Sequence, residues 1–177
     1  MNFLLNSEYS IRNACLSDID RLIAIEKSAS QAFLDIPKLA WVAESDTISR
    51  ELHSELISNF YSIVAINKVD QIVGFLYSKK YKDDLYILEI DVDQSQQKKG
   101  IGKLLINYLI NKGKNEGVKR ITLTTFIDVI WNQQFYEKIG FETFIDNLPD
   151  YLADIIHKEI SEGFLKETRC AMYLEIE

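Results

Sequence analysis

The pattern of hydrophobic and polar positions along the chain predicts strands and helices in a mixed order. Short apolar runs rich in β-branched and aromatic residues predict strands at residues 9–14, 61–66, 71–80, 85–92, 121–126, 141–145 and 171–176. Apolar residues spaced three and four apart predict helices at residues 17–29, 45–58, 100–114, 132–138 and 149–163. Residues 33–43 have no clear period and predict a packed loop or, as the alternative, a lid over a binding site.

Residues with strong local preferences set the expected ends of these elements. Ser17 is the expected N-cap of the first helix, and either Ser45 or Asp46 is the expected N-cap of the second. Pro149 suits the first position of the last helix. A hairpin followed by strand–helix–strand units indicates an α/β or α+β domain with a single sheet.

The composition is that of an ordinary globular protein. With 177 residues, 47% of them hydrophobic, the chain can bury a real core, and we expect one domain over residues 1–177. Its apolar runs are shorter than the roughly 20 residues of a membrane span, and residues 1–6 lack the basic start of a signal peptide. Cys15 and Cys170 form neither a disulfide framework nor a metal-ligand spacing. We therefore expect a cytoplasmic protein without a metal.

The formal net charge of −7 bears on the partners of the protein. This charge argues against a general nucleic-acid binder. It mildly favours a cationic partner, such as an amine.

The most informative segment is Gln-Lys-Lys-Gly-Ile-Gly-Lys at residues 97–103. It lies between an apolar strand and a predicted helix. The first N–H groups of a helix lack partners within it, and the helix dipole adds positive potential there. A glycine lets a bulky anion approach the backbone without a Cβ in the way. The segment therefore predicts a binding site for a phosphate or pyrophosphate.

Two known phosphate-binding loops do not fit this segment. A P-loop needs four residues between its glycines and a Ser or Thr after its lysine. Here one residue separates Gly100 from Gly102, and Leu104 follows Lys103. The dinucleotide fingerprint G-x-G-x-x-G requires a third glycine where this chain has Leu105.

The pattern Q-x-x-G-x-G after a strand and before a helix resembles the acyl-CoA loop of the GNAT superfamily of N-acetyltransferases. A second motif supports this resemblance, because Asn132 is followed by Phe135-Tyr136, Gly140 and Phe141 at the family's spacing. Residues 10–145 follow the order of the family core, and residues 146–177 add a helix and a strand. Ile130 replaces a proline that one bacterial subset carries, which concerns the stiffness of the loop.

The resemblance implies a single mixed, mostly antiparallel central sheet flanked by helices. It also implies acetyl-CoA as co-substrate and direct transfer to a primary amine of a small molecule, a peptide or a protein. Backbone N–H groups of the loop would hold the pyrophosphate, and the backbone of the preceding strand would pair with the pantetheine arm. The residues that the resemblance assigns to the cofactor are Ile90, Asp91, Val92, Gln97, Lys98, Lys99, Gly100, Ile101, Gly102, Lys103, Asn132 and Tyr136.

Several of these assignments have a simpler alternative. Lys98 and Lys99 either add charge to the anion site or form a solvated basic patch, and a lysine cannot make the bidentate contact of an arginine. Asn132 either bonds the pantetheine or only caps its helix.

The resemblance assigns the catalytic roles to Tyr136 and Glu89. Tyr136 matches the general acid, since a phenol near the sulfur can protonate the CoA thiolate, whose thiol has a pKa of about 8.5. Its alternative is a tyrosine packed on the sheet. Glu89 matches the acid that serves many relatives as general base, directly or through a water. Glu89 and Asp91 are two apart on a strand and share one face, and two close carboxylates raise the pKa of one of them. A solvent-facing strand edge is the alternative.

The remaining candidates carry less information. His53 and His157 lie in helical stripes without a metal or triad spacing, and we assign them no role. Cys15 and Cys170 are most simply buried small hydrophobic residues. A CoA-binding sensor or partner subunit without catalysis is the competing function. The acceptor and the oligomeric state, including a homodimer, stay open.

Overall fold

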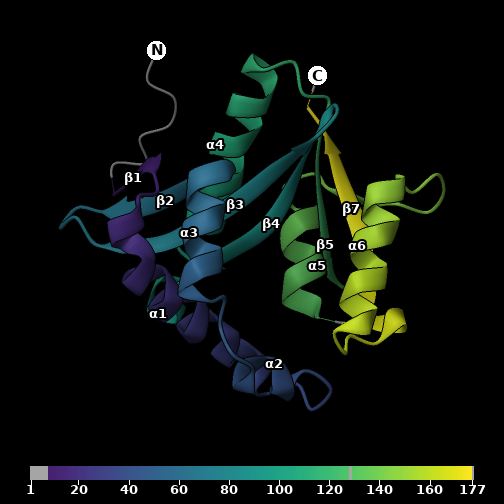
Figure 1. Cartoon of the computed structure of the whole chain (residues 1–177), viewed down its shortest axis with the longest axis horizontal. Coiled ribbons are helices and arrows are strands. Elements are labelled where there is room, and N and C mark those ends of the chain that lie inside the picture. The colour runs from purple at the N-terminus through teal and green to yellow at the C-terminus, as the bar shows by residue number, and fades with distance from the viewer. Residues whose placement is uncertain (1–7, 128, 177) are drawn as a thin grey trace. The chain divides into compact units, whose positions relative to one another are not determined.

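A computed structural model describes residues 8–127 and 129–176 of the chain (Figure 1). The strands in this part form one seven-stranded sheet in the order β1-β2-β3-β4-β5-β7-β6. Their bounds are Tyr9–Asn13 for β1, Tyr61–Asn67 for β2, Ile72–Tyr81 for β3, Asp84–Val92 for β4, Arg120–Phe126 for β5, Glu142–Thr143 for β6 and Arg169–Glu175 for β7.

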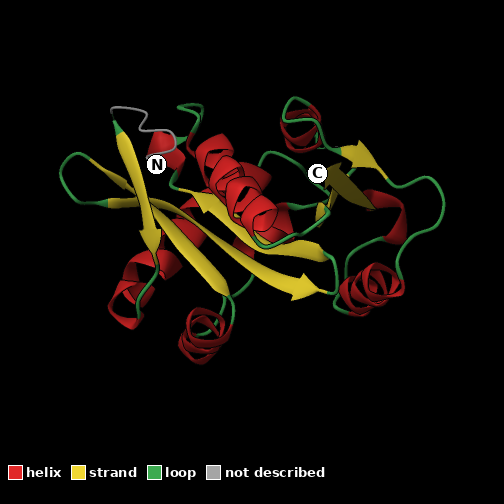
Figure 2. Cartoon of the chain, turned by 90° about the horizontal axis from the view of Figure 1, so that it is seen from above, coloured by secondary structure: helices red, strands yellow, loops and turns green. Residues whose placement is uncertain are grey.

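Helices flank this sheet (Figure 2). Their bounds are Ile19–Ser30 for α1, Ala40–Glu44 for α2, Arg50–Asn59 for α3, Ile101–Asn115 for α4, Ile130–Glu137 for α5 and Asp150–Ser161 for α6. Short 3-10 helices lie at Leu16–Asp18, Gln31–Phe33, Gln94–Gln96 and Lys166–Thr168. The strand pairs β1–β2, β2–β3, β5–β7 and β6–β7 are antiparallel, and β4–β5 is parallel. The predicted mixed, mostly antiparallel sheet is therefore confirmed.

The chain divides into two compact units. The first contains the described residues up to Ser78 together with Leu88–Leu109, and the second contains Lys79–Ile87 and the described residues from Ile110 onward. The elements β3, β4 and α4 contribute residues to both units. The single domain over residues 1–177 stays a prediction.

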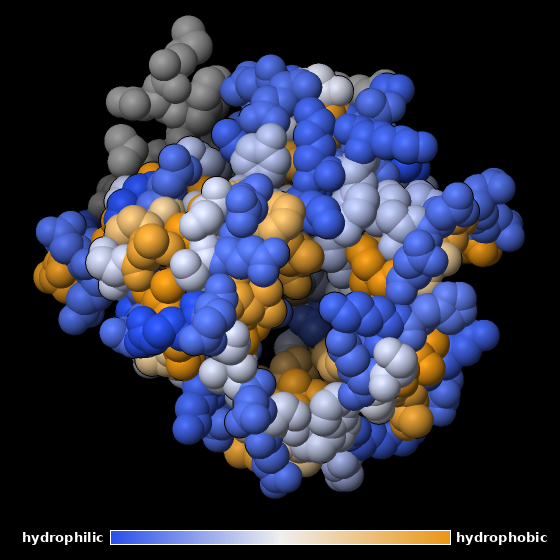
Figure 3. Space-filling model, viewed as in Figure 1, coloured by the Kyte–Doolittle hydropathy of each residue, from blue (hydrophilic) through white to orange (hydrophobic). Residues whose placement is uncertain are grey.

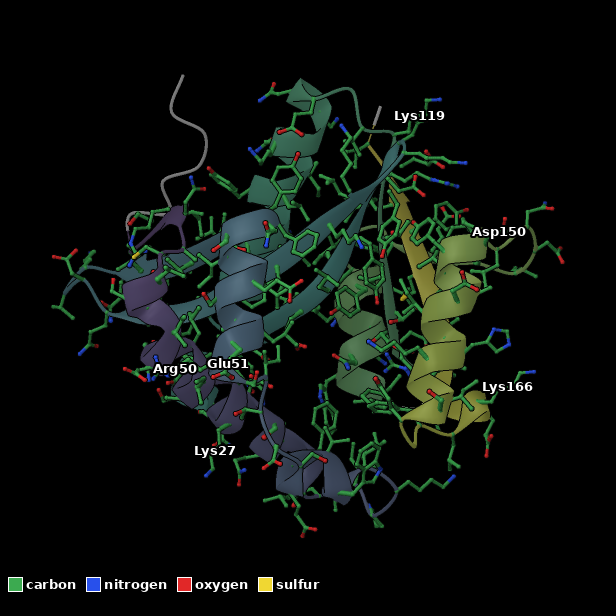
Figure 4. The ribbon with its side chains drawn as sticks, viewed as in Figure 1. Lys27, Arg50, Glu51, Lys119, Asp150 and Lys166 are labelled. Atoms are coloured by element: carbon green, nitrogen blue, oxygen red, sulfur yellow. The ribbon has the colours of Figure 1, made fainter. Side chains whose placement is uncertain are left out.

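The first unit packs α1 and α3 on the strands β2 and β3. Its core consists of fully or nearly fully buried side chains, namely Leu22, Ile25, Leu56, Val64, Ile72, Phe75 and Tyr77. At the surface, Arg50 on the first turn of α3 forms an ion pair with Asp20 of α1 (Figure 4). Burial of the apolar stripes of both helices holds this unit together, since each Å² of buried apolar surface contributes about 25 cal/mol.

The second unit is built around β5 and β7. These strands pair from Arg120 opposite Glu175 to Phe126 opposite Arg169, and β4 joins β5 over Asp84–Tyr86. Arg120 makes two hydrogen bonds of 2.9 Å to the buried carboxylate of Asp84, which also accepts a bond from the hydroxyl of Tyr151 at 2.8 Å. Tyr151 belongs to α6, which starts at Asp150, and Lys166 lies beyond its other end (Figure 4).

The predicted helix starts needed three corrections. The first helix follows a 3-10 turn and starts at Ile19, so Ser17 is not its N-cap. The cap of α3 is Ser49 rather than Ser45 or Asp46. The N–H of Ile48 is bound by the Glu26 carboxylate at 2.9 and 3.1 Å, and this distant partner keeps the preceding segment out of the helix. The predicted N1 proline, Pro149, is instead the residue before α6.

Two further elements differ from their predicted form. Part of the irregular segment 33–43 is helical, because α2 starts at Ala40. The strand predicted at residues 141–145 is reduced to Glu142–Thr143, which pairs with β7.

The length and polarity of the helices bear on membrane insertion in the described part of the chain. None of its helices is both long and apolar enough to cross a bilayer. In the space-filling view, hydrophobic residues lie in separate groups between hydrophilic ones (Figure 3).

Replacement of Ser49 by alanine tests the observed start of α3. The Ser49 side chain accepts a hydrogen bond from the N–H of Leu52 at 3.2 Å. Loss of such a cap lowers the free energy of unfolding by about 1 kcal/mol, measurable by urea denaturation. Ser45→Ala is the matched control, since the Ser45 hydroxyl only donates to the carbonyl of Trp41 at an exposed position. Equal losses for both variants would contradict the observed helix start.

Candidate active site

The loop between β4 and α4 has the backbone geometry of an anion site. Lys98 and Gly100 both adopt positive φ angles, 62° and 82°. Leu104 donates the first hydrogen bond of the helix, to the carbonyl of Gly100 at 3.0 Å. Among the described residues, no acceptor takes a hydrogen bond from the N–H groups of residues 98–103. These donors are available to an anion at the positive end of a helix of 15 residues.

Gly100 leaves open space beside these donors. A Cβ built on Gly100 would have no other atom within 4 Å. The side chains of Lys98, Lys99 and Lys103 are exposed, and the Lys99 ammonium donates to Gln96 at 3.0 Å. The loop therefore combines unused backbone donors, free space and lysine charge.

The loop is tied firmly to the end of β4. The Gln97 amide donates to the carbonyl of Val92 at 3.2 Å, and the N–H of Asp93 donates to the carbonyl of Val73 at 2.9 Å. The Asp93 carboxylate accepts bonds from the N–H of Ser95 at 3.0 Å and from Arg21 at 2.7 Å. Gln97, predicted to bind the cofactor, thus positions the loop, and Ile101 anchors it with a buried side chain.

The end of β4 lies very close to β3. A Cβ on Gly74 would come within 2.9 Å of the Asp91 carbonyl oxygen and 3.3 Å of the Val92 side chain. Only a glycine permits this approach. The side chains of Ile90 and Val92 are partly buried, as expected if these residues offer their backbone to a ligand.

The acid pair of β4 is not a solvated strand edge. Asp91, like Glu89, is only partly exposed. Its Oδ2 atom is buried and has no hydrogen-bond partner within the described residues. Burial, followed by the charges of Glu89 and Glu26, raises the pKa of Asp91 well above its ordinary value.

Sequence reasoning missed a group of three side chains in the first unit: Glu26 of α1, His53 of α3 and Tyr77 of β3. His53 and Tyr77 are 0% exposed, and His53 Nδ1 lies 2.8 Å from the Tyr77 hydroxyl. His53 Nε2 lies 3.6 Å from Glu26 Oε2. The one signal in the sequence was a histidine at a position of the apolar stripe that Leu56 continues.

Tyr136 lies in α5, in the second unit. Its side chain is 7% exposed, and its ring makes edge contacts with Phe135 and Phe141 at centroid distances of 5.1 and 5.6 Å. Asn132 does not cap α5, because the helix starts at Ile130 and the N–H of Asn132 donates to the carbonyl of Val129. This removes the simpler of the two roles expected for Asn132.

The two cysteines differ in their exposure to solvent. Cys170 is buried, and this burial raises the pKa of its thiol to about 11. Cys15 is exposed, contrary to the prediction that it is buried, and its sulfur lies 3.3 Å from the Asp18 carboxylate. Within residues 8–127 and 129–176, no three His, Cys, Asp or Glu side chains are grouped so that they could hold a metal.

The sheet order and the loop after β4 define an acyltransferase fold. Residues 25–141 match the acetyltransferase (GNAT) family, more than half of the chain. The protein belongs to this family.

Solved structures of N-acetyltransferases share the fold over nearly the whole chain. PaiA N-acetyltransferase from Thermoplasma acidophilum, in complex with coenzyme A, has a TM-score of 0.73 at 17% identity and covers 94% of this chain and 98% of its own. The ribosomal-protein-S18-alanine N-acetyltransferase from Escherichia coli has a TM-score of 0.69 at 17% identity, with 96% and 94% covered. Ard1 from Thermoplasma volcanium has a TM-score of 0.68 at 19% identity, with 96% and 98% covered.

The pH dependence of stability tests the buried state of Asp91. Because folding raises its pKa, the folded chain holds a proton that the unfolded chain loses above about pH 4. Stability is therefore lost as the pH rises from there through the raised pKa. Asp91→Asn removes this loss. We therefore expect the free energy of unfolding of the variant, relative to that of the wild type, to increase between pH 5 and pH 8.

Urea denaturation at both pH values measures this gain. Asp46→Asn, which changes an exposed acid of the same unit, is the control and should follow the wild type. If the free energies of unfolding of Asp91→Asn and the wild type differ by the same amount at every pH, then folding does not raise the pKa of Asp91 and the prediction is wrong.

Proposed function

We propose that this acetyltransferase moves the acetyl group of acetyl-CoA to a primary amine of a small molecule, a peptide or a protein. The observation that carries the proposal is the loop at residues 98–103, whose backbone donors are unused and whose Gly100 leaves space for a pyrophosphate. The complex of PaiA N-acetyltransferase with coenzyme A supports the choice of donor.

In this proposal the donor lies along β4. The N–H groups of residues 98–103 bind the pyrophosphate, with Lys98, Lys99 and Lys103 contributing charge. Backbone groups of Ile90 and Val92, on either side of Asp91, pair with the pantetheine arm. The carbonyl of Val92 already accepts a bond from Gln97, and a carbonyl oxygen can accept a second one. Asn132 of α5 is a further donor or acceptor for this arm.

The chemical step needs a base and an acid. The acceptor ammonium gives a proton to Glu89, directly or through a water, and the free amine attacks the thioester carbonyl. The tetrahedral intermediate then collapses, the bond from carbon to sulfur breaks, and the thiolate takes a proton from the Tyr136 hydroxyl. The nitrogen gives up its remaining extra proton to solvent as the amide forms, and solvent returns a proton to the Tyr136 phenolate. General acid–base catalysis of this kind contributes about 10²–10⁴-fold to a rate.

Tyr136→Phe tests the general acid that protonates the CoA thiolate. The wild type and the variant are each mixed with acetyl-CoA and a panel of amines, namely polyamines, amino sugars, amino acids and peptide N-termini. We expect CoA release with at least one amine. We also expect the variant to lower kcat by about 10²-fold or more, with an unchanged KM for acetyl-CoA. The control is Tyr173→Phe, which removes an exposed hydroxyl bonded to Glu142. No CoA release above background with any amine would overturn the proposed function, and an unaffected Tyr136→Phe would remove Tyr136 as the acid.

Gly100→Val tests the donor site by placing a side chain in the open space beside the loop amides. We expect the affinity for CoA to fall by more than about tenfold, or 1.4 kcal/mol, in isothermal titration calorimetry. Gly117→Val is the matched control, since Gly117 also has a positive φ, 69°, and open space around its Cβ position, but lies outside the loop. It introduces comparable backbone strain and should keep the affinity. Equal affinities for the wild type and Gly100→Val would refute the assignment of the loop.

A further inference from the structure

Helix α1 is bonded to the short turn that leads into the anion-binding loop. This turn consists of residues 93–96, a 3-10 helix at Gln94–Gln96 with Asp93 as its N-cap. Arg21, Ile25 and Ser28 lie on one face of α1, because positions three and four residues apart share a helix face. Ile25 is buried in the core of the first unit, and the two polar residues on either side of it bond to the turn.

Arg21 joins α1 both to β3 and to the turn through one guanidinium group. Its Nε donates to the carbonyl of Ile72 in β3 at 2.9 Å, and its Nη2 donates to Asp93 Oδ2 at 2.7 Å. The N–H of Asp93 donates in turn to the carbonyl of Val73 in β3 at 2.9 Å. These bonds form a closed ring with the first two residues of β3. The rigid fork of an arginine can bond two acceptors in fixed directions, which the single ammonium of a lysine cannot do.

The Asp93 carboxylate uses both of its oxygens to hold the turn. Oδ2 accepts the bond from Arg21, and Oδ1 accepts from the N–H and the hydroxyl of Ser95 at 3.0 and 2.7 Å. Burial disfavours the charged form of Asp93, but the bonds from Ser95 and Arg21 outweigh it and lower its pKa. The carboxylate is therefore ionised at neutral pH and paired with Arg21.

Ser28 provides a second attachment of the turn to α1. Its hydroxyl accepts a hydrogen bond from the N–H of Gln94 at 3.0 Å. Within the turn, the N–H of Gln96 donates to the carbonyl of Asp93 at 2.8 Å, and the Gln96 side chain accepts from the Lys99 ammonium at 3.0 Å. A continuous chain of contacts thus runs from α1 through the turn to the loop at residues 98–103.

The ion pair also bears on the charge beside the loop. Asp93 is the acidic residue nearest in the sequence to residues 98–103. An unpaired carboxylate at this position would repel a phosphate group, and the guanidinium of Arg21 compensates its charge.

We propose that Arg21 and Ser28 are positioning residues for the donor, which fix the turn at residues 93–96 so that the N–H groups of residues 98–103 are preorganised for the pyrophosphate of acetyl-CoA. The inference rests on the donor site of the proposed function, but not on the acceptor or on the transfer step. Donors that are fixed before the ligand arrives avoid the cost of ordering the loop on binding.

Arg21→Gln tests the inference through the binding of CoA and of pantetheine, which lacks the pyrophosphate. We expect the affinity for CoA, measured by isothermal titration calorimetry, to fall by about tenfold, since small displacements of positioned groups weaken their interactions strongly. The affinity for pantetheine, followed by the amide NMR signals of Ile90 and Val92, should stay nearly unchanged. A residue that served stability alone would leave both affinities of the folded protein unchanged.

Arg50→Gln is the matched control, because it removes the arginine of another ion pair of α1, the exposed pair with Asp20. It should keep the affinity for CoA. Arg21→Lys keeps the positive charge without the fork and should recover only part of the affinity. An unchanged affinity for CoA in Arg21→Gln, an equal loss in Arg50→Gln, an equal loss for pantetheine, or a full recovery in Arg21→Lys would each overturn the inference.

Ser28→Ala provides the test if Arg21→Gln does not fold. It should weaken the binding of CoA but not that of pantetheine, whereas Ser30→Ala, which removes a hydroxyl bonded only to the carbonyl of Lys27 within α1, should weaken neither. Equal affinities for CoA in both serine variants would then contradict the inference.

The wild type separates this inference from the proposed function. A wild type that binds no CoA would refute the donor site, and the inference with it. A wild type that binds CoA no more tightly than Arg21→Gln would refute the inference and leave the proposed function standing.

Discussion

The connection between β4 and α4 is held by hydrogen bonds that leave its own amide groups unused. The Gln97 side chain binds the carbonyl of Val92 in β4, and the N–H of Asp93 binds the carbonyl of Val73 in β3. The loop therefore does not need the amides of residues 98–103 for its shape. Positive φ angles at Lys98 and Gly100 bring the amides to the start of α4. An anion-binding site results because the restraints come from the flanking residues, and the donors remain available to a phosphate group.

Asp91 lies on the same strand, β4. At Gly74, β3 approaches the backbone of β4 so closely that a side chain would collide with the Asp91 carbonyl, and the Oδ2 atom of Asp91 is buried. Burial of carboxyls without a cation destabilises the fold at high pH.

The sequence predicted what local patterns determine. The strands of the described residues, of which only β6 is much shorter than predicted, followed from periodicity. The helix at α4 and the loop before it followed from periodicity, two glycines and a cluster of lysines, and the family followed from two short motifs. The start of α3 was wrong because Ile48 is bound by Glu26, 22 residues away. The contact between His53 and Tyr77 was missed for the same reason, since these residues lie 24 residues apart and on different elements. Contacts of this kind leave no periodic signal, and a histidine in an apolar stripe is equally compatible with a silent core position.

The central claim is that residues 98–103 bind the pyrophosphate of coenzyme A through their backbone. Amide NMR of the ¹⁵N-labelled protein, titrated once with CoA and once with pantetheine, tests this claim most directly, because pantetheine lacks the pyrophosphate. We expect CoA to shift the amide signals of residues 98–103 strongly, and pantetheine to leave them nearly unchanged while it shifts the signals of Ile90 and Val92. Saturating CoA that leaves the amides of residues 98–103 unshifted would contradict the account.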